Sequence, residues 1–289
     1  IVDSVFVSWV SEASLTAVSL AFPAQNLMIS LASGTAVGVN ALMGRALGAK
    51  DQKRADTVAM NGLFLALVGF VLCAVLGLTL SDFYFRSQTD VEEIIQMGNR
   101  YLMIVMGASF GAFGQMMLER LLQGTGHSIL SMYTQGAGAI INIILDPIFI
   151  FVFKMGVAGV AWATFLCQGI SCVLAVAVVI RRLKQLPSQG KPVLFSGDLL
   201  GRFVVIAIPS VLQQSFISVG NILIQSVINR FGTDIMAGYS ASVKLNNLVI
   251  TSFTTIGNGI SNYAAQNLGA GKLTRIQEGF RAALKMVWL

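Results

Sequence analysis

Residues 141–164 read INIILDPIFIFVFKMGVAGVAWAT, and Asp146 is the single carboxylate in this nearly apolar stretch. Asn142 lies four residues earlier, so the two side chains share one face of a helix. Pro147 lacks a backbone N–H and its ring strains the carbonyl one turn back, so we expect a kink there. A carboxylate inside an apolar helix is costly unless something binds it. We therefore expect a cation at Asp146.

The composition places this helix in a membrane protein. Only 11% of the 289 residues are charged, whereas soluble domains carry roughly 25%. Uncharged runs cover residues 13–44, 57–81, 101–118, 155–180, 203–229 and 245–271. Most of these runs exceed the roughly 20 residues that a helix needs to cross a bilayer. We therefore predict an all-α polytopic membrane protein that is embedded in a lipid bilayer.

The predicted helices fall into two groups. The first group covers residues 13–47, 58–80, 94–122, 129–153 and 157–180, after the end of a helix at 1–9, with an acidic loop at 81–93. Residues 181–201 form a polar linker, and the second group covers 202–229, 235–268 and the start of a helix near Ile276. The chain has no initiator Met and both of its ends lie in apolar segments. We therefore expect truncation at both ends.

An internal repeat relates the two groups. After a shift of 221 residues, Asn26-Leu27 falls on Asn247-Leu248, Gly38 on Gly259, and Leu47-Gly48-Ala49 on Leu268-Gly269-Ala270. The two copies lie six spans apart and so share one orientation. This pattern predicts two six-helix lobes related by a parallel pseudo-two-fold repeat, an architecture typical of transporters, with about 12 helices in the whole protein. The chain would contain the N-lobe at 1–180, a linker at 181–201 and the start of the C-lobe at 202–289.

The loop charges predict the orientation of the helices. Taken alternately, the turns on one side collect thirteen basic residues, Arg45, Lys50, Lys53, Arg54, Arg120, Arg181, Arg182, Lys184, Lys191, Arg202, Lys272, Arg275 and Arg281, and the other side has Arg86, Arg100, Lys154 and Arg230. Because cytoplasmic loops are rich in Lys and Arg, loops 48–56, 123–128, 181–201 and 269–275 are predicted to face the cytoplasm from the plasma membrane. The net charge of +6 is explained in this way without a nucleic-acid partner.

Several polar groups are predicted to lie at one depth. Asp146 lies nine residues before the turn at Met155, Thr164 nine residues after it, and Asp3 eight residues before a turn at Ser11. At about 1.5 Å per residue these groups are roughly 13 Å deep, near the middle of a hydrocarbon core of roughly 30 Å. Asp3, Asp146 and Thr164, with Asn142 one turn deeper, can therefore form one layer if their helices are neighbours.

The chemistry of this layer leaves two cations open. Carboxylate, amide and hydroxyl oxygens suit a hard cation such as Na⁺. The same carboxylates could hold a proton, because burial favours their neutral form. Two structural alternatives also remain. Asp146 could be a kink residue that the local backbone satisfies, and Asn142 and Thr164 could be ordinary interhelical hydrogen-bonding residues.

Lys244 is a further deep polar residue, eleven residues into the predicted helix at 235–268. We expect it to line the transport cavity or to pair with an acid outside this chain. The alternative is that its side chain snorkels toward the membrane surface. This alternative has little support, because Lys244 lies far from both ends of the predicted helix.

Three stretches of the sequence resemble the multidrug and toxic compound extrusion (MATE) family. The first stretch is Val2-Asp3-Ser4-Val5-Phe6-Val7 together with residues 15–23. The second is residues 44–51, whose pattern recurs at 266–272. The third is residues 122–126 together with 142–147 and 156–164. The resemblance covers essentially the whole chain. It implies a twelve-helix, two-lobed exporter that exchanges Na⁺ or H⁺ for organic cations. We also expect a monomer that transports small-molecule drugs and has no cofactor besides the coupling ion.

The resemblance also implies a site. In the DinF-like branch, a cation site uses an Asp of the first helix, an Asn and an Asp one turn apart on the fifth, and a Thr on the sixth, which match Asp3, Asn142, Asp146 and Thr164. Another branch carries a functional Glu on the seventh helix. The corresponding region here holds Gln213 and Gln214 as cavity-lining candidates and no acid, which favours the DinF-like branch.

Other function classes receive less support from the sequence. A flippase of lipid-linked sugars would share the fold and is the main alternative. An enzyme is not indicated, since no His-rich metal set or Ser/Lys pair in facing helices is found. A channel fits less well, because a deep carboxylate pocket in a repeated fold suits exchange better than a continuous pore. The natural substrate and the coupling ion stay open.

Overall fold

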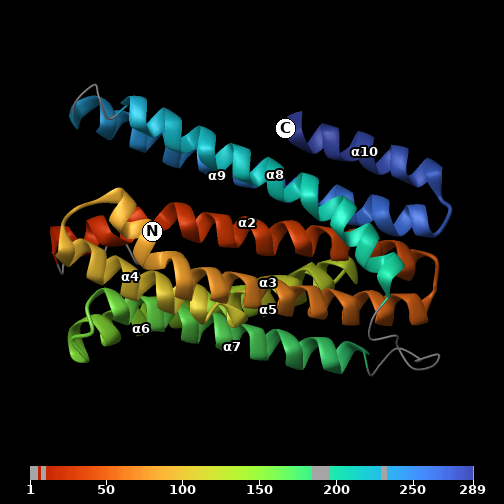
Figure 1. Cartoon of the computed structure of the whole chain (residues 1–289). Helices are drawn as coiled ribbons and strands as arrows, with labels where there is room; N and C mark the ends of the chain where they lie inside the picture. The colour runs from red at the N-terminus through yellow and green to blue at the C-terminus, as the bar shows by residue number, and fades with distance from the viewer. Residues whose placement is uncertain (1–5, 8–10, 184–195, 229–232, 289) are drawn as a thin grey trace.

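The computed structural model describes residues 6–7, 11–183, 196–228 and 233–288, and its regular elements are helices (Figure 1). They are α2 (Glu12–Gly48), α3 (Gln52–Gln88), α4 (Glu92–Gly107), α5 (Phe110–Gly124), α6 (Ser128–Pro147), the π-helix η1 (Ile148–Val152), α7 (Val157–Leu183), α8 (Gly197–Ile228), α9 (Thr233–Gly269) and α10 (Leu273–Trp288). In the described part, five helices are long and apolar enough to span a membrane, or six if the bent pair α4 and α5 forms one span. The predicted all-α membrane fold is confirmed.

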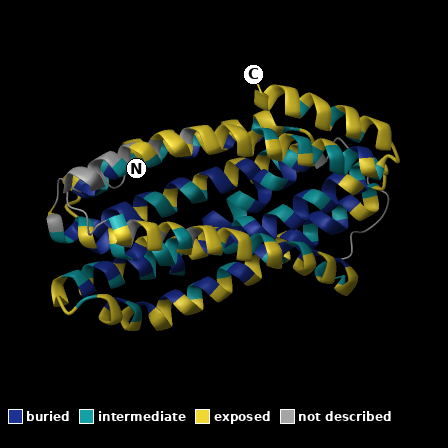
Figure 2. Cartoon of the chain, turned by 90° about the horizontal axis from the view of Figure 1, so that it is seen from above, coloured by how far each residue is buried: buried dark blue, intermediate teal, exposed yellow. Residues whose placement is uncertain are grey.

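Helix α2 is the central element of the bundle. It packs against α3, α4 and α5 on one side and against α8 and α9 on the other, while α7 packs on α4, α5 and α6. Buried residues follow these contacts, and exposed residues cover the outward faces (Figure 2). Many exposed side chains are large and apolar, as expected where a helix faces lipid or another part of a membrane protein.

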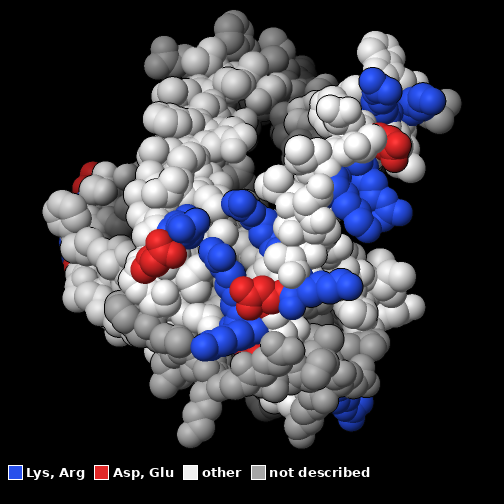
Figure 3. Space-filling model, turned by 90° about the vertical axis from the view of Figure 1, so that its right-hand side faces the viewer, with Lys and Arg blue, Asp and Glu red and all other residues white. Residues whose placement is uncertain are grey.

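Basic residues gather at one end of the bundle, which we call the basic end. The turns after α2, α5 and α9 lie there, and Figure 3 looks directly at this end. Lys53, Arg54 and Arg202 share a surface hollow with Asp51 and Asp198, and Arg202 pairs with Asp198 (3.1 Å). This is the end that the loop charges assign to the cytoplasm.

The helices extend further than the sequence predicts. α3 begins at Gln52 because Asp51 caps it, accepting a hydrogen bond from the backbone N–H of Arg54 (3.0 Å). Similarly, α7 continues to Leu183 and α8 begins at Gly197, so both helices enter the predicted linker at 181–201. The basic turns are therefore shorter than predicted.

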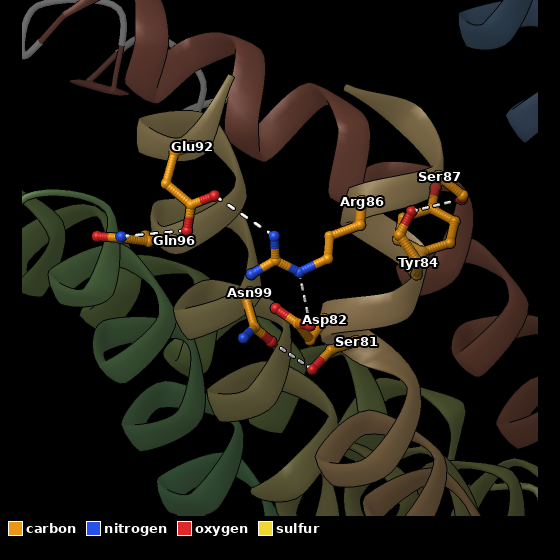
Figure 4. A network of polar contacts seen from close by, with 8 residues as sticks. All are labelled: Ser81, Asp82, Tyr84, Arg86, Ser87, Glu92, Gln96 and Asn99. Carbon is orange, nitrogen blue, oxygen red and sulfur yellow. Dashed lines mark hydrogen bonds and ion pairs between the residues drawn. The ribbon is translucent and has the colours of Figure 1, made fainter. Parts of the chain in front are cut away.

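The predicted acidic loop at 81–93 is wrong, because α3 continues as a helix to Gln88. Arg86 explains the continuation: its Nε donates to Asp82 one turn earlier (2.9 Å) and a terminal nitrogen reaches Glu92 across the turn (3.4 Å) (Figure 4). The buried Ser81 hydroxyl donates to Asn99 and joins α3 to α4. Charges that resemble a loop in the sequence thus cover the exposed face of a helix end.

The predicted single helix at 94–122 is also wrong, because it is broken between α4 and α5 with a bend of 43°. Ala108 and Ser109 separate the two helices. The Ser109 hydroxyl donates to the carbonyl of Met106 (2.7 Å), so it satisfies a backbone acceptor at the end of α4. The break reorients α5 relative to α4.

The predicted repeat is visible in the helix boundaries. α2 begins at Glu12 and α9 at Thr233, α3 at Gln52 and α10 at Leu273, and each pair differs by the predicted 221 residues. α2 and α9 also have the same length of 37 residues. The second copy therefore reproduces the helix bounds of the first.

The two repeat copies cross closely near the basic end. A Cβ on Gly44 would lie 3.0 Å from the Cβ of Ala265, its own repeat equivalent. A Cβ on Gly48 would overlap the carbonyl oxygen of Gln266, and a Cβ on Gly269 would overlap that of Arg45. These two contacts are exchanged by the 221-residue shift, so the pseudo-two-fold axis passes between Gly44 and Ala265.

We predict that Gly48→Ala destabilises the folded protein, because the new methyl group would push α2 and α9 apart. The expected cost is about 1–3 kcal/mol, the range of overpacked sites, measured as a lower Tm of the full-length protein in detergent. Gly257→Ala is the matched control, since nothing lies within 4 Å of a Cβ there. Equal Tm values for the two variants would contradict the close crossing.

Candidate functional site

The carboxylate-bearing end of α6 departs from regular α-helix. Pro147 is the last residue of α6 and is followed by the π-helix Ile148–Val152. Proline cannot donate to the carbonyl one turn back, and the Phe153 N–H bonds the carbonyl of Ile148, five residues earlier (3.0 Å). The predicted kink is thus a change of helix type directly after Asp146. Such π segments are frequent at functional sites.

Three of the predicted cation ligands lie together. Asn142 Nδ2 donates a hydrogen bond to Asp146 Oδ1 (3.2 Å), and the Asp146 side chain is fully buried (0% exposed). Asn142 also lines a cavity of about 280 Å³ with Thr164 of α7. Asn142 therefore contacts the carboxylate of α6 and shares a cavity with Thr164 of α7.

The remaining candidates are placed differently. Asp3 lies outside the described residues, as does the side chain of Lys244, although its backbone is part of α9. Gln213 and Gln214 lie on α8, and both are exposed in this chain. Their predicted roles stay predictions.

The cavity is built from one face of each of three helices. Its lining residues recur at i, i+3, i+4 and i+7, and they are Ala112, Gln115, Met116 and Glu119 of α5, Gln135, Gly138, Ala139 and Asn142 of α6, and Thr164, Cys167, Gln168 and Ser171 of α7. Five of these residues were not predicted from the sequence: Gln115, Glu119, Gln135, Gln168 and Ser171. The helical spacing of Gln115 and Glu119, and of Thr164, Gln168 and Ser171, is a signal that could have indicated all of them except Gln135.

Glycines allow the three helices to approach closely around this cavity. A Cβ on Gly111 of α5 would lie 2.9 Å from the backbone nitrogen of Gly169 of α7. A Cβ on Gly138 of α6 would overlap the Ser171 hydroxyl, so the missing side chain leaves room for that hydroxyl. Small residues at helix contacts are typical of membrane bundles.

Two buried hydroxyls along the cavity have no hydrogen-bond partner in the described part of the chain. They are Thr164 Oγ1 and Ser171 Oγ. Buried polar groups are usually hydrogen-bonded, so such exceptions need an explanation. Oxygen atoms of this kind, next to a carboxylate and an amide, are a donor set that fits a hard cation such as Na⁺.

A repeated helical bundle with ionisable groups buried inside its spans is an architecture typical of secondary transporters. The MatE family model matches residues 1–148 and 209–289, and the chain belongs to this family. The two matched segments contain the two copies of the repeat, α2 and α9.

Individual relatives are longer than this chain. It is 29% identical to the probable multidrug resistance protein YoeA of Bacillus subtilis (strain 168), over 97% of this chain and 62% of that protein. It is 23% identical to the FAD transporter of Shewanella oneidensis, over 99% of this chain and 64% of that protein. A crystal structure of MATE in complex with MaD5 has a TM-score of 0.89 at 25% identity and covers 99% of this chain and 65% of that one. The chain thus spans less than two thirds of these relatives.

We predict that Thr164→Val leaves the Tm of the cation-free protein unchanged or raises it. Removing a buried hydroxyl that has no partner relieves a desolvation cost. Thr134→Val is the matched control on α6, because the buried Thr134 hydroxyl donates to the carbonyl of Ser131 (2.9 Å) and its loss should lower Tm. Thermal unfolding in Na⁺-free detergent buffer measures both, and a lower Tm for Thr164→Val than for Thr134→Val would contradict the assignment.

Proposed function

We propose that this chain is part of a multidrug efflux transporter that exports organic cations in exchange for Na⁺ or H⁺. The observation that carries the proposal is the fully buried Asp146 carboxylate, hydrogen-bonded by Asn142 within a membrane span. A buried carboxylate in a bilayer is retained where it binds an ion or a proton. The multidrug resistance name of YoeA supports the export of drugs.

The proposed domains follow the repeat: an N-lobe at 1–180, a cytoplasmic linker at 181–201 and the start of a C-lobe at 202–289. The bounds of α7 and α8 favour a shorter connection than the full linker. The cation site lies in the N-lobe, on α6 and α7. Asp3 of the preceding segment and Lys244 of α9 are proposed to complete the polar lining of the transport cavity, with Gln213 and Gln214 of α8.

The proposed mechanism is alternating access between the lobes. At the basic end, Gln266 Nε2 donates to the carbonyl of Gly124 (2.9 Å) and Asn40 Nδ2 donates to Asn262, so contacts between the repeat copies close that end. A cation that enters from outside neutralises Asp146 and displaces the drug there. Because cation and drug favour different states, occupancy of one site shifts the equilibrium of the lobes.

A flippase of lipid-linked sugars is the alternative within the same fold. The two functions predict different responses to ion gradients, because only the antiporter must couple its substrate to an ion. The FAD transporter among the relatives shows that similar chains are named for other substrates as well.

We predict that Asp146→Asn abolishes ion-driven efflux, because the amide cannot be neutralised by a cation. The measurement follows ethidium in liposomes that contain the full-length protein. A Na⁺ gradient at fixed pH is imposed first, then a pH gradient without Na⁺. Transport driven by either gradient and lost in Asp146→Asn establishes the antiporter and identifies its ion.

Asp90→Asn is the control, since Asp90 is exposed in the turn between α3 and α4. This variant should transport ethidium at the wild-type rate. Normal efflux by Asp146→Asn would contradict the proposed cation site at Asp146. Wild-type protein that responds to neither gradient would favour the flippase.

A further inference from the structure

Glu119 is a second buried carboxylate inside a membrane span. It lies on α5, its residue is 8% exposed, and its Oε1 accepts a hydrogen bond from Gln115 Nε2 (2.9 Å). In the described part of the chain, no Lys or Arg nitrogen lies within 4.0 Å of it. The neighbouring Arg120 acts on the carboxylate through its charge without an ion-pair contact, and its guanidinium donates to Gln123 (3.1 Å). One amide hydrogen bond compensates a buried negative charge poorly, so the carboxylate favours a bound cation or proton.

The cavity joins Glu119 to the predicted cation site. α5 and α7 end near the basic end and α6 begins there, so Glu119, Gln135 and Ser171 are the lining residues nearest that end. Asn142 and Thr164 lie at the opposite end of the same cavity. Seven residues separate the two ends on each helix, which is about 10 Å at 1.5 Å per residue.

The polar atoms along this distance are suited to a small cation. The fully buried Ser171 hydroxyl has no partner in the described part of the chain and lines the cavity at the level of Glu119. Gln135 adds an amide oxygen at the same end, and Gln168 adds one between the two ends. The cavity therefore has oxygen donors at both ends and along its length, the ligand type that Na⁺ prefers.

We propose that Glu119 is a second cation-binding carboxylate, and that the coupling cation passes along this cavity from Asn142 and Asp146 to Glu119 on its way to the cytoplasm. The ligand is a small hard cation, either Na⁺ or a proton. The binding site stands independently, whereas its place in the cation pathway rests on the proposed antiport function. Glu119 binds the cation after Asp146 releases it, so the positive charge of the cation stays compensated while it crosses the membrane.

The binding test uses purified full-length protein in detergent and measures Tm against Na⁺ at fixed pH, and against pH without Na⁺. A ligand that binds only the folded state raises Tm with its concentration. With the ion that binds, Glu119→Gln and Asp146→Asn should each lose part of the stabilisation, and the double variant should lose all of it. Glu119→Asp keeps a carboxylate and should restore most of the response. Glu93→Gln is the matched control, since Glu93 is exposed in the first turn of α4.

The pathway test uses the ethidium assay in liposomes. Glu119→Gln should slow gradient-driven efflux at least about tenfold, the effect of losing one charged ligand group. In Glu119→Gln, the cation concentration that displaces bound ethidium at equilibrium should stay within about threefold of the wild-type value, because Asp146 is intact. In Asp146→Asn, the cation should no longer displace ethidium.

The outcomes separate the two proposals. If Glu119→Gln responds to both ions as Glu93→Gln does, or if Asp146→Asn alone removes the whole response, Glu119 is not a cation site. If Glu119→Gln and Asp146→Asn each lose part of the Tm increase but efflux by Glu119→Gln is normal, the cation does not pass through Glu119. If wild-type protein responds to neither gradient, the antiport function and the pathway fail, and the binding test still decides the site.

Discussion

The close approach of α2 and α9 is the constraint on which the arrangement of the two repeat copies depends. Gly48 and Gly269 each face a carbonyl oxygen of the other helix, and a side chain at either position would overlap it. Between them, Gly44 meets its own repeat equivalent Ala265. Because interhelical packing in a membrane relies on such small residues, a sequence repeat becomes a structural two-fold axis at this point. Helix α2 carries this contact on one side and packs against α3, α4 and α5 on the other.

The second constraint is the cost of charge inside the bilayer. Asp146 and Glu119 are both buried in spans, and each accepts a hydrogen bond from an amide four residues earlier, Asn142 or Gln115. The same i, i+4 arrangement thus occurs twice: Gln115 and Glu119 both line the cavity, and Asn142 lines its other end while bonded to Asp146. In the proposed antiport, a mobile cation at such a group makes its charge state depend on occupancy, as ion coupling requires.

The sequence predicted the fold and part of the site for physical reasons that apply locally. Uncharged runs identify spans, and the 221-residue shift matches the observed bounds of α2 and α9. Counting residues from a turn placed Asp146 and Thr164 at one depth with Asn142 one turn deeper, and in the structure Asn142 and Thr164 line one cavity. The break at Ser109 and the continuation of α3 through Arg86 were not predicted, since they depend on hydrogen bonds and ion pairs that composition does not reveal.

Glu119 was missed because a carboxylate near the end of a predicted helix resembles a solvated group at the membrane surface. Its burial depends on α6 and α7 covering α5, and the closeness of those helices depends on Gly111 and Gly138. Its position also connects the two constraints. Glu119 lies five residues before Gly124, whose carbonyl accepts the hydrogen bond from Gln266 of α9. One turn and a half of α5, about 7.5 Å, therefore joins the cation cavity to the contact between the repeat copies. In the proposed alternating access, opening the basic end breaks that hydrogen bond at the C-terminal end of the helix that carries Glu119. The charge state of this carboxylate and the closure of the lobes would then act on the same short segment.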